Sequence, residues 1–194
     1  MCEIIINIGI HIFLFILGTI GFVVSFHFGI LKKIDVFFYR GLFLILIWGI
    51  IVSLLMWIIK SLTTFTNVIS AKDIILLFVL FCSIHTVLFT HLPVTAERSI
   101  SVFMLGYMTD NKDKEFTEKE IEDIFKDIYV DKYEAFKKRF HEQEVTGTIK
   151  QIENGKYQIT KNGISLMKMY EWISKIFNVN QELIHPDCNK GDES

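Results

Sequence analysis

Four histidines lie within or at the ends of long apolar segments, where an ionisable side chain is costly and usually has a function. They are His11, His27, His85 and His91. Only His11 and His85 lie deep in their segments. A proton or ion relay needs several polar groups at one depth, but the polar neighbours in the sequence are only Asn7, Ser83 and Thr86. The pattern favours hydrogen-bonded neutral histidines over a small transporter or proton-linked component, which is our third hypothesis.

Other residues that could carry chemistry are sparse. His185-Pro186-Asp187-Cys188 offers metal-ligating side chains, but too few to close a metal site. His141, followed by Glu142 and Glu144, indicates a helix end rather than acid–base machinery. The sequence has no glycine-rich phosphate loop and no metal-spaced pair of histidines on a helix. We therefore predict that the protein is not an enzyme and uses no cofactor and no metal.

The elements that hold these residues are predicted to be membrane helices. The chain has 194 residues, of which 51% are hydrophobic, so it is too apolar for an ordinary water-soluble domain. A hydrocarbon core of roughly 30 Å needs about 20 helical residues. Three apolar segments meet this length, and we predict transmembrane spans over residues 4–31, 41–59 and 74–92. Because Met1-Cys2-Glu3 has no basic residue, we interpret the first span as a retained anchor rather than a cleaved signal peptide.

Basic residues near the spans predict the orientation, because Lys and Arg are retained on the cytoplasmic side. Lys32, Lys33 and Arg40 crowd the first loop, whereas the second loop has only Lys60 and Lys72. We therefore predict a multi-pass protein of the inner (cytoplasmic) membrane. Its N-terminus lies outside, and everything after the third span lies in the cytoplasm.

Small residues recur on one face of the first span. They are Gly18, Gly21, Ser25 and Gly29. Such a stripe lets another helix backbone approach closely. We predict a helix-packing face, directed at the other two spans of the chain in preference to a partner protein.

The sequence of the second half of the chain predicts a series of short helices. Thr95 is predicted to cap a helix that continues to about Met108. Thr117 with Glu120 forms a capping box for a second helix, which continues to about Ile128. A third helix, which can be capped by Asp131, is predicted to end at about Glu142.

A hairpin and a final helix follow. Two β-prone runs, 148–152 and 156–160, flank Asn154-Gly155, and Asn-Gly favours a two-residue hairpin turn. The final helix is predicted to begin near Thr160 and to carry a broad apolar face. The residues of this face are Leu166, Met169, Tyr170, Ile173, Ile176 and Phe177.

Three helices, a hairpin and a closing helix resemble a winged-helix domain over about residues 95–178. The resemblance is most specific at Gly147-Thr148-Ile149 and at the run from Gly155 to Gly163, which is similar to the wing and helix entry of bacterial winged-helix regulators. It implies that a helix at about Lys132–Glu142 can enter a DNA major groove while the hairpin contacts the backbone. Winged helices also serve as protein-binding modules.

Charge separates these two uses. DNA binding needs a basic face, because neutralising phosphates supplies most of the affinity. The candidate DNA or partner contacts are Lys132, Lys137, Lys138, Arg139, Lys150 and Lys156. Residues 1–92 hold five basic and three acidic side chains, so the net charge of −2 for the whole chain leaves the second half acidic. Nucleic acid is therefore a disfavoured partner.

We predict a mainly α membrane protein with three transmembrane helices, followed by a small α+β winged-helix-like cytoplasmic domain. The predicted parts are a membrane domain at 1–93, the winged-helix-like domain at 94–179 and a polar tail at 180–194. Pro93 leaves almost no linker at the junction. The leading hypothesis is a non-catalytic accessory or regulatory protein, embedded in the lipid bilayer, whose cytoplasmic domain docks onto a membrane-bound partner. The alternative is a membrane-tethered winged-helix transcription regulator that binds DNA.

Overall fold

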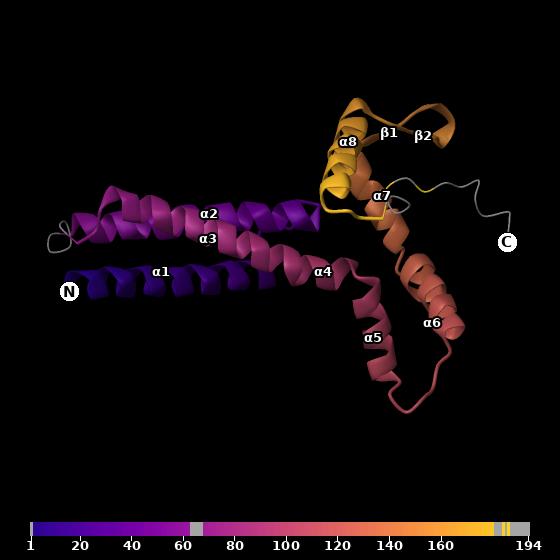
Figure 1. The fold of residues 1–194 in the computed structure, drawn as a ribbon, viewed down its shortest axis with the longest axis horizontal. Helices are drawn as coiled ribbons and strands as arrows, with labels where there is room; N and C mark the ends of the chain where they lie inside the picture. Colours follow the sequence, from indigo (N-terminus) through magenta and orange to yellow (C-terminus); the bar gives the residue numbers. More distant parts are fainter. Residues whose placement is uncertain (1, 63–67, 181–183, 185, 187–194) are drawn as a thin grey trace. The chain divides into compact units, whose positions relative to one another are not determined.

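The structure, a computed structural model, describes residues 2–62, 68–180, 184 and 186, and it is mainly helical (Figure 1). Three long helices come first: α1 (Cys2–His27), α2 (Phe37–Ser61) and α3 (Ala71–His91). Each is long and apolar enough to cross a membrane, and the third candidate span continues to Arg98. Three apolar helices at the predicted positions are thus confirmed.

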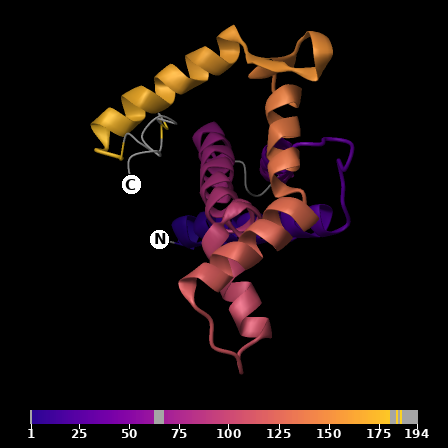
Figure 2. The same cartoon turned by 90° about the vertical axis from the view of Figure 1, so that its right-hand side faces the viewer.

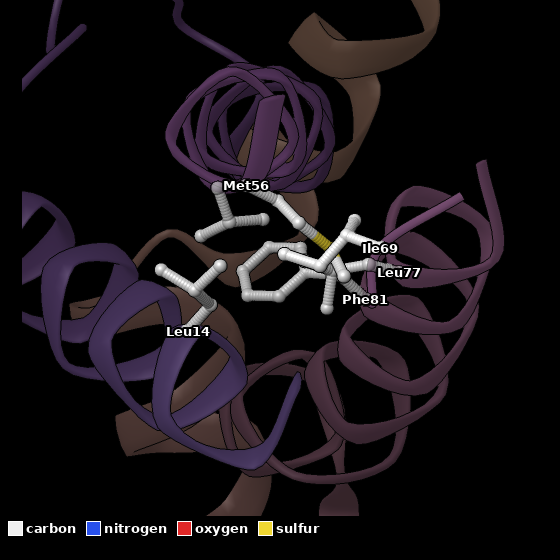
Figure 3. Packing of buried hydrophobic residues seen from close by; sticks show 6 residues of the cluster. Leu14, Met56, Ile69, Leu77 and Phe81 are labelled. Carbon is white, nitrogen blue, oxygen red and sulfur yellow. The ribbon is translucent and has the colours of Figure 1, made fainter. Parts of the chain in front are cut away.

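Buried side chains from all three helices meet in one cluster. Figure 3 shows five of its members converging between the helices: Leu14, Met56, Ile69, Leu77 and Phe81. A second cluster joins Phe22, Leu44, Ile45 and Phe89, and Val94 packs against it from beyond the end of α3. The three apolar helices therefore form one packed bundle.

The first span is shorter than predicted, because α1 ends at His27 rather than at residue 31. Gly29 adopts a φ of 70°, the left-handed conformation with which glycine commonly ends a helix. The guanidinium of Arg40 donates hydrogen bonds to the carbonyl oxygens of Phe26 (2.9 Å) and Ile30 (3.2 Å). A cation at this position satisfies carbonyls that the helix end leaves open. Gly29 therefore lies in the turn after α1, not on the helical face where we predicted it.

The chain leaves the bundle through helices that follow one another directly. Leu92 separates α3 from α4 (Pro93–Arg98), and Ser99 separates α4 from α5 (Ile100–Asp110). The single helix predicted from Thr95 to Met108 is wrong. The Thr95 hydroxyl donates back to the Thr90 carbonyl (3.2 Å), whereas Ser99 is extended and its hydroxyl caps α5 by accepting from the Val102 amide.

The next helix, α6 (Glu118–Ile124), begins with the predicted capping box, which is confirmed. It continues as a π-helical segment, η1 (Phe125–Lys132), which keeps the wider turns of a π-helix over its whole length. The amide of Tyr133 donates to the carbonyl of Ile128, five residues earlier, at 2.8 Å. Asp131 therefore lies inside a helical segment and cannot cap the next one, so the predicted cap is wrong. The following helix, α7 (Ala135–Val145), starts after Glu134, which has a left-handed φ of 50° and makes no side-chain cap.

The chain divides into two compact units, residues 1–125 and 126–194. In the second unit, β1 (Ile149–Gln151) and β2 (Tyr157–Ile159) form the predicted antiparallel hairpin. The turn is not the predicted two-residue type, because the amide of Ile152 donates to the carbonyl of Lys156 and encloses the three residues of η2 (Glu153–Gly155). Gly155 supplies the positive φ that closes a loop of this length.

The last helix, α8 (Lys161–Ile176), begins at the predicted cap. The Thr160 hydroxyl accepts from the Gly163 amide (3.2 Å) and donates to the carbonyl of Gly147 (2.7 Å). Gly163 lies so close to the hairpin that a Cβ added there would collide with the backbone oxygen of Thr148. Backbone cannot move aside as a flexible side chain can, so this contact requires glycine.

Replacing Gly163 with alanine should therefore loosen the junction of α8 with the hairpin. We expect Gly163→Ala to destabilise the second unit by about 1–3 kcal/mol, the usual cost of overpacking. Hydrogen exchange of the β1 and β2 amides in the full chain measures the effect. Asn162→Ala, one residue earlier and exposed, is the control, and equal protection in both variants would contradict the prediction.

Candidate functional site

The small-residue face of α1 is directed at the other two apolar helices. A Cβ on Gly18 would lie 2.6 Å from a methyl group of Val52 in α2 and 2.7 Å from the Phe81 ring in α3. A Cβ on Gly21 would collide with the ring of Trp48. Ser25 is buried, and its hydroxyl accepts a hydrogen bond from the Trp48 indole at 2.9 Å. These three residues allow close approach within the chain, while Gly29 lies beyond the helix end.

The two deep histidines make hydrogen bonds between helices. His85 is buried, stacks on the Phe81 ring at 3.9 Å between ring centroids and places Nε2 3.0 Å from the Thr19 hydroxyl of α1. Its Nδ1 lies 2.8 Å from the Phe81 carbonyl oxygen. Thr19 was missed by sequence reasoning, because it is 66 residues away and only the folded bundle brings the two together.

His11 plays a similar part nearer the other end of the bundle. Its Nδ1 lies 2.9 Å from the carbonyl oxygen of Asn7, and its Nε2 lies 3.3 Å from that of Asp73 in α3. The Asn7 amide also donates to the carbonyl of Val68 at 3.0 Å. Both deep histidines thus link α1 to α3, and Asn7 links α1 to the segment before α3.

A groove lies between α5 and α6, outside the apolar bundle of the first unit. It has a volume of about 600 Å³. Its lining is mainly apolar, with two glutamates at the rim: Ile100, Met104, Met108, Phe116, Thr117, Glu118, Ile121, Glu122 and Phe125. Sequence reasoning predicted helical structure on both sides of the groove, although with the wrong start for α5, and it missed the groove itself. The sequence does contain a signal for the groove: Ile100, Met104 and Met108 are spaced by four residues, which places all three on one side of α5.

The capping box fixes one wall of this groove. The amide and hydroxyl of Thr117 donate to the Glu120 carboxylate at 2.7 and 2.8 Å. These two hydrogen bonds hold the pKa of the Glu120 carboxyl below its ordinary value of 4.5, and the bond from the amide has the larger effect. The first turn of α6 is therefore fastened by hydrogen bonds that are stronger when the Glu120 carboxyl is ionised.

The predicted basic contacts in the second unit are partly engaged in ion pairs. Lys137 pairs with Glu134 at 3.0 Å, and Arg139 pairs with the buried Glu142 at 2.6 Å. Lys138, Lys150 and Lys156 are exposed. Lys132 ends η1 and precedes α7, so it does not lie on the helix where we predicted it.

The tail motif cannot be placed, because His185, Asp187 and Cys188 lie outside the described residues. Within the described ranges, no three His, Cys, Asp or Glu side chains gather in a way that could hold a metal ion.

Comparisons with protein-family models, curated proteins and solved structures give no match for this chain. The winged-helix resemblance therefore stays a prediction.

The close approach of α1 makes a specific prediction about its glycines. Gly21→Ala should destabilise the bundle by about 1–3 kcal/mol, because the Trp48 ring must move and its bond to Ser25 is then strained. Thermal unfolding of the full chain in detergent measures this. Gly9→Ala is the matched control, since a Cβ there meets nothing within 4 Å. Equal melting temperatures for the two variants would show that the face does not pack as described.

The capping box makes a prediction about pH. Because the pKa of Glu120 is lowered by folding, its stabilisation is complete above the ordinary value of 4.5 and is lost as the pH falls through the lowered pKa. Hydrogen exchange at the Glu120 amide, which donates to Thr117, should accelerate over that interval relative to the intrinsic rate. Glu120→Gln should remove this pH dependence, whereas Glu118→Gln in the same turn should keep it. An unchanged profile in Glu120→Gln would refute the role of the carboxylate.

Proposed function

We propose that the protein is a non-catalytic integral membrane accessory or regulatory protein, which docks its part after α3 onto a membrane-bound partner. The bundle supports insertion, because its helices expose large apolar side chains outward as well as inward. Phe13, Leu54 and Val87, one from each helix, are each more than half exposed. A helix that is apolar all round is stable only when buried in protein or lipid.

The proposed orientation places the N-terminus outside and the part after α3 in the cytoplasm of an inner membrane. It is supported by the basic turn between α1 and α2, where Lys32 and Lys33 are exposed and Arg40 binds the end of α1.

The observation that carries the docking proposal is the helical continuity of α3 and α4, with the single extended residue Ser99 between α4 and α5. The amide of Leu92 donates to Leu88, and that of Ala96 donates to Leu92, both at 2.9 Å, so helical bonding crosses the junction. Val94 then packs against the Phe89 cluster of the bundle. A tethered DNA-binding domain gains its reach from a flexible linker, and the segment between α3 and α5 is not such a linker. The groove between α5 and α6 is instead carried close to the end of a span.

The occupant that fits the groove is an amphipathic helix of the partner, with basic residues beside its apolar face. The methionines suit such a helix, because their side chains adapt to irregular apolar surfaces. Glu118 lines the groove and offers a carboxylate to the basic residues, whereas Glu122 is paired with Lys119 at 3.2 Å. Helix-in-groove binding of this kind is a common recognition mode.

Photo-crosslinking in native membranes tests the docking. A photoreactive residue at Met108 should capture one integral membrane protein, and the linked peptide should be an amphipathic helix with basic residues. The control is Leu105, which is 63% exposed on the same helix but does not line the groove. Glu118→Lys should lower the yield several-fold, whereas Glu115→Lys, outside the groove, should not. Equal capture from both positions, or capture of the chain's own copies only, would contradict the proposal.

The hairpin supports a second candidate, the membrane-tethered DNA regulator. The hydroxyl and amide of Thr148 bond to the carbonyl of Gln143 at 2.9 and 3.0 Å, so β1 is fastened to the end of α7 as a wing would be. Lys150 and Lys156 on the hairpin are exposed. For this candidate, the full chain should bind duplex DNA with an affinity that falls steeply with salt, and Lys150→Glu with Lys156→Glu should weaken it. A flat titration at low salt would exclude it.

A further inference from the structure

The last helix, α8, carries a large apolar face that its own unit leaves exposed. Figure 2 shows α8 leaving the hairpin in a direction away from α7. The exposed members of the face are Met169, Tyr170, Trp172, Ile176 and Phe177. Trp172 is 65% exposed and Phe177 is 74% exposed. Contiguous apolar surface of this kind marks an interaction site.

A row of lysines borders this face. Lys161, Lys168 and Lys175 follow one another at seven-residue intervals, which places them on one side of the helix, and all three are exposed. Trp172 lies four residues after Lys168 and three before Lys175, so its ring borders both the lysines and the apolar face. Glu171 is the single acidic residue of α8. The helix is thus basic, although the second half of the chain is acidic.

The chemistry of this face selects its partner. Helices that lie in the plane of a membrane interface combine Trp, Phe and aliphatic residues on one side with lysines on the other. Trp and Tyr prefer the headgroup level, and the lysine stems can lie along the acyl chains while their ammonium groups stay in water. The three apolar helices of the chain already require a bilayer, so a tethered α8 meets that surface at a high effective concentration.

We propose that α8 lies in the interface of the bilayer that its own chain spans. Its apolar face is buried at the boundary of headgroups and acyl chains, and Lys161, Lys168 and Lys175 contact anionic lipid headgroups. This inference rests on the membrane insertion that belongs to the proposed function. It adds a second attachment to the membrane, sensitive to salt and to lipid composition.

The test uses the full chain in nanodiscs that each hold one copy, made with lipids brominated in the acyl chain, with and without anionic headgroups. Bromine quenches tryptophan fluorescence on contact. The difference between the wild-type protein and Trp172→Phe isolates the signal of Trp172. Trp48 and Trp57 on α2 remain in that variant, and Trp57, which is 58% exposed, is the internal reference for insertion of the spans.

We expect strong quenching of Trp172 in anionic discs. Lys168→Gln and Lys175→Gln should each weaken the partition of α8 into the bilayer interface by about fivefold. Added salt should weaken this partition as well. Ile176→Ser should reduce the quenching, whereas Ile152→Ser, an equally polar change at an exposed position of the hairpin, should not.

Three results would overturn the inference. If Trp57 is quenched and Trp172 is not, the spans are inserted but α8 lies off the bilayer. If neither tryptophan is quenched, insertion itself fails, and the proposed function fails with it. If Trp172 is unquenched in these discs, and is shielded from solvent only in a parallel preparation with two copies in each disc, a second copy covers α8 instead of lipid.

Discussion

The short helical junction between α3 and α5 is the constraint on which the rest of the account depends. Hydrogen bonds cross from α3 into α4, Val94 joins the core of the bundle, and only Ser99 separates α4 from α5. Pro93 is compatible with this continuity because it occupies the first turn of α4, where its missing amide costs little. A surface that follows such a junction is held close to the end of α3. This supports the proposed docking onto a membrane-bound partner over the tethered DNA regulator.

In the bilayer that we propose, the bundle would pack without the usual driving force. Helices there gain nothing from escaping water, so association depends on close packing and on hydrogen bonds between helices. Gly18 and Gly21 supply the close packing, because they leave room for Phe81 and Trp48. Trp48 with Ser25 supplies one of the bonds, and His85 with Thr19 supplies another. A polar group that would be costly in lipid is thereby converted into a specific contact.

The sequence was most informative where one local signal decides the structure. Apolar length was enough for the three long helices, and the Thr117–Glu120 box and the Thr160 cap were found because each needs only residues three positions apart. It failed where two local signals competed. Asp131 is an acceptable cap by type, but the π-helical turns of η1 continue past it, and Ser99 rather than Thr95 caps α5.

Partners distant in the chain could not be predicted in this way. Thr19 and His85 belong to different helices, and the groove between α5 and α6 exists only after two helices pack. The alternation of apolar and polar residues predicts which side of a helix is apolar. It does not predict whether that side is covered, and the exposed face of α8 is the clearest case.

Rigid coupling of the span to α5 can be measured directly by the distance distribution between two spin labels. One label replaces Val79 on α3 and the other replaces Leu105 on α5, both exposed, in a full-length variant whose native cysteines are serine. The protein is reconstituted in lipid discs. We predict a single narrow distribution, because hydrogen bonds cross from α3 into α4 and only Ser99 separates α4 from α5. A broad distribution, typical of a flexible tether, would contradict it.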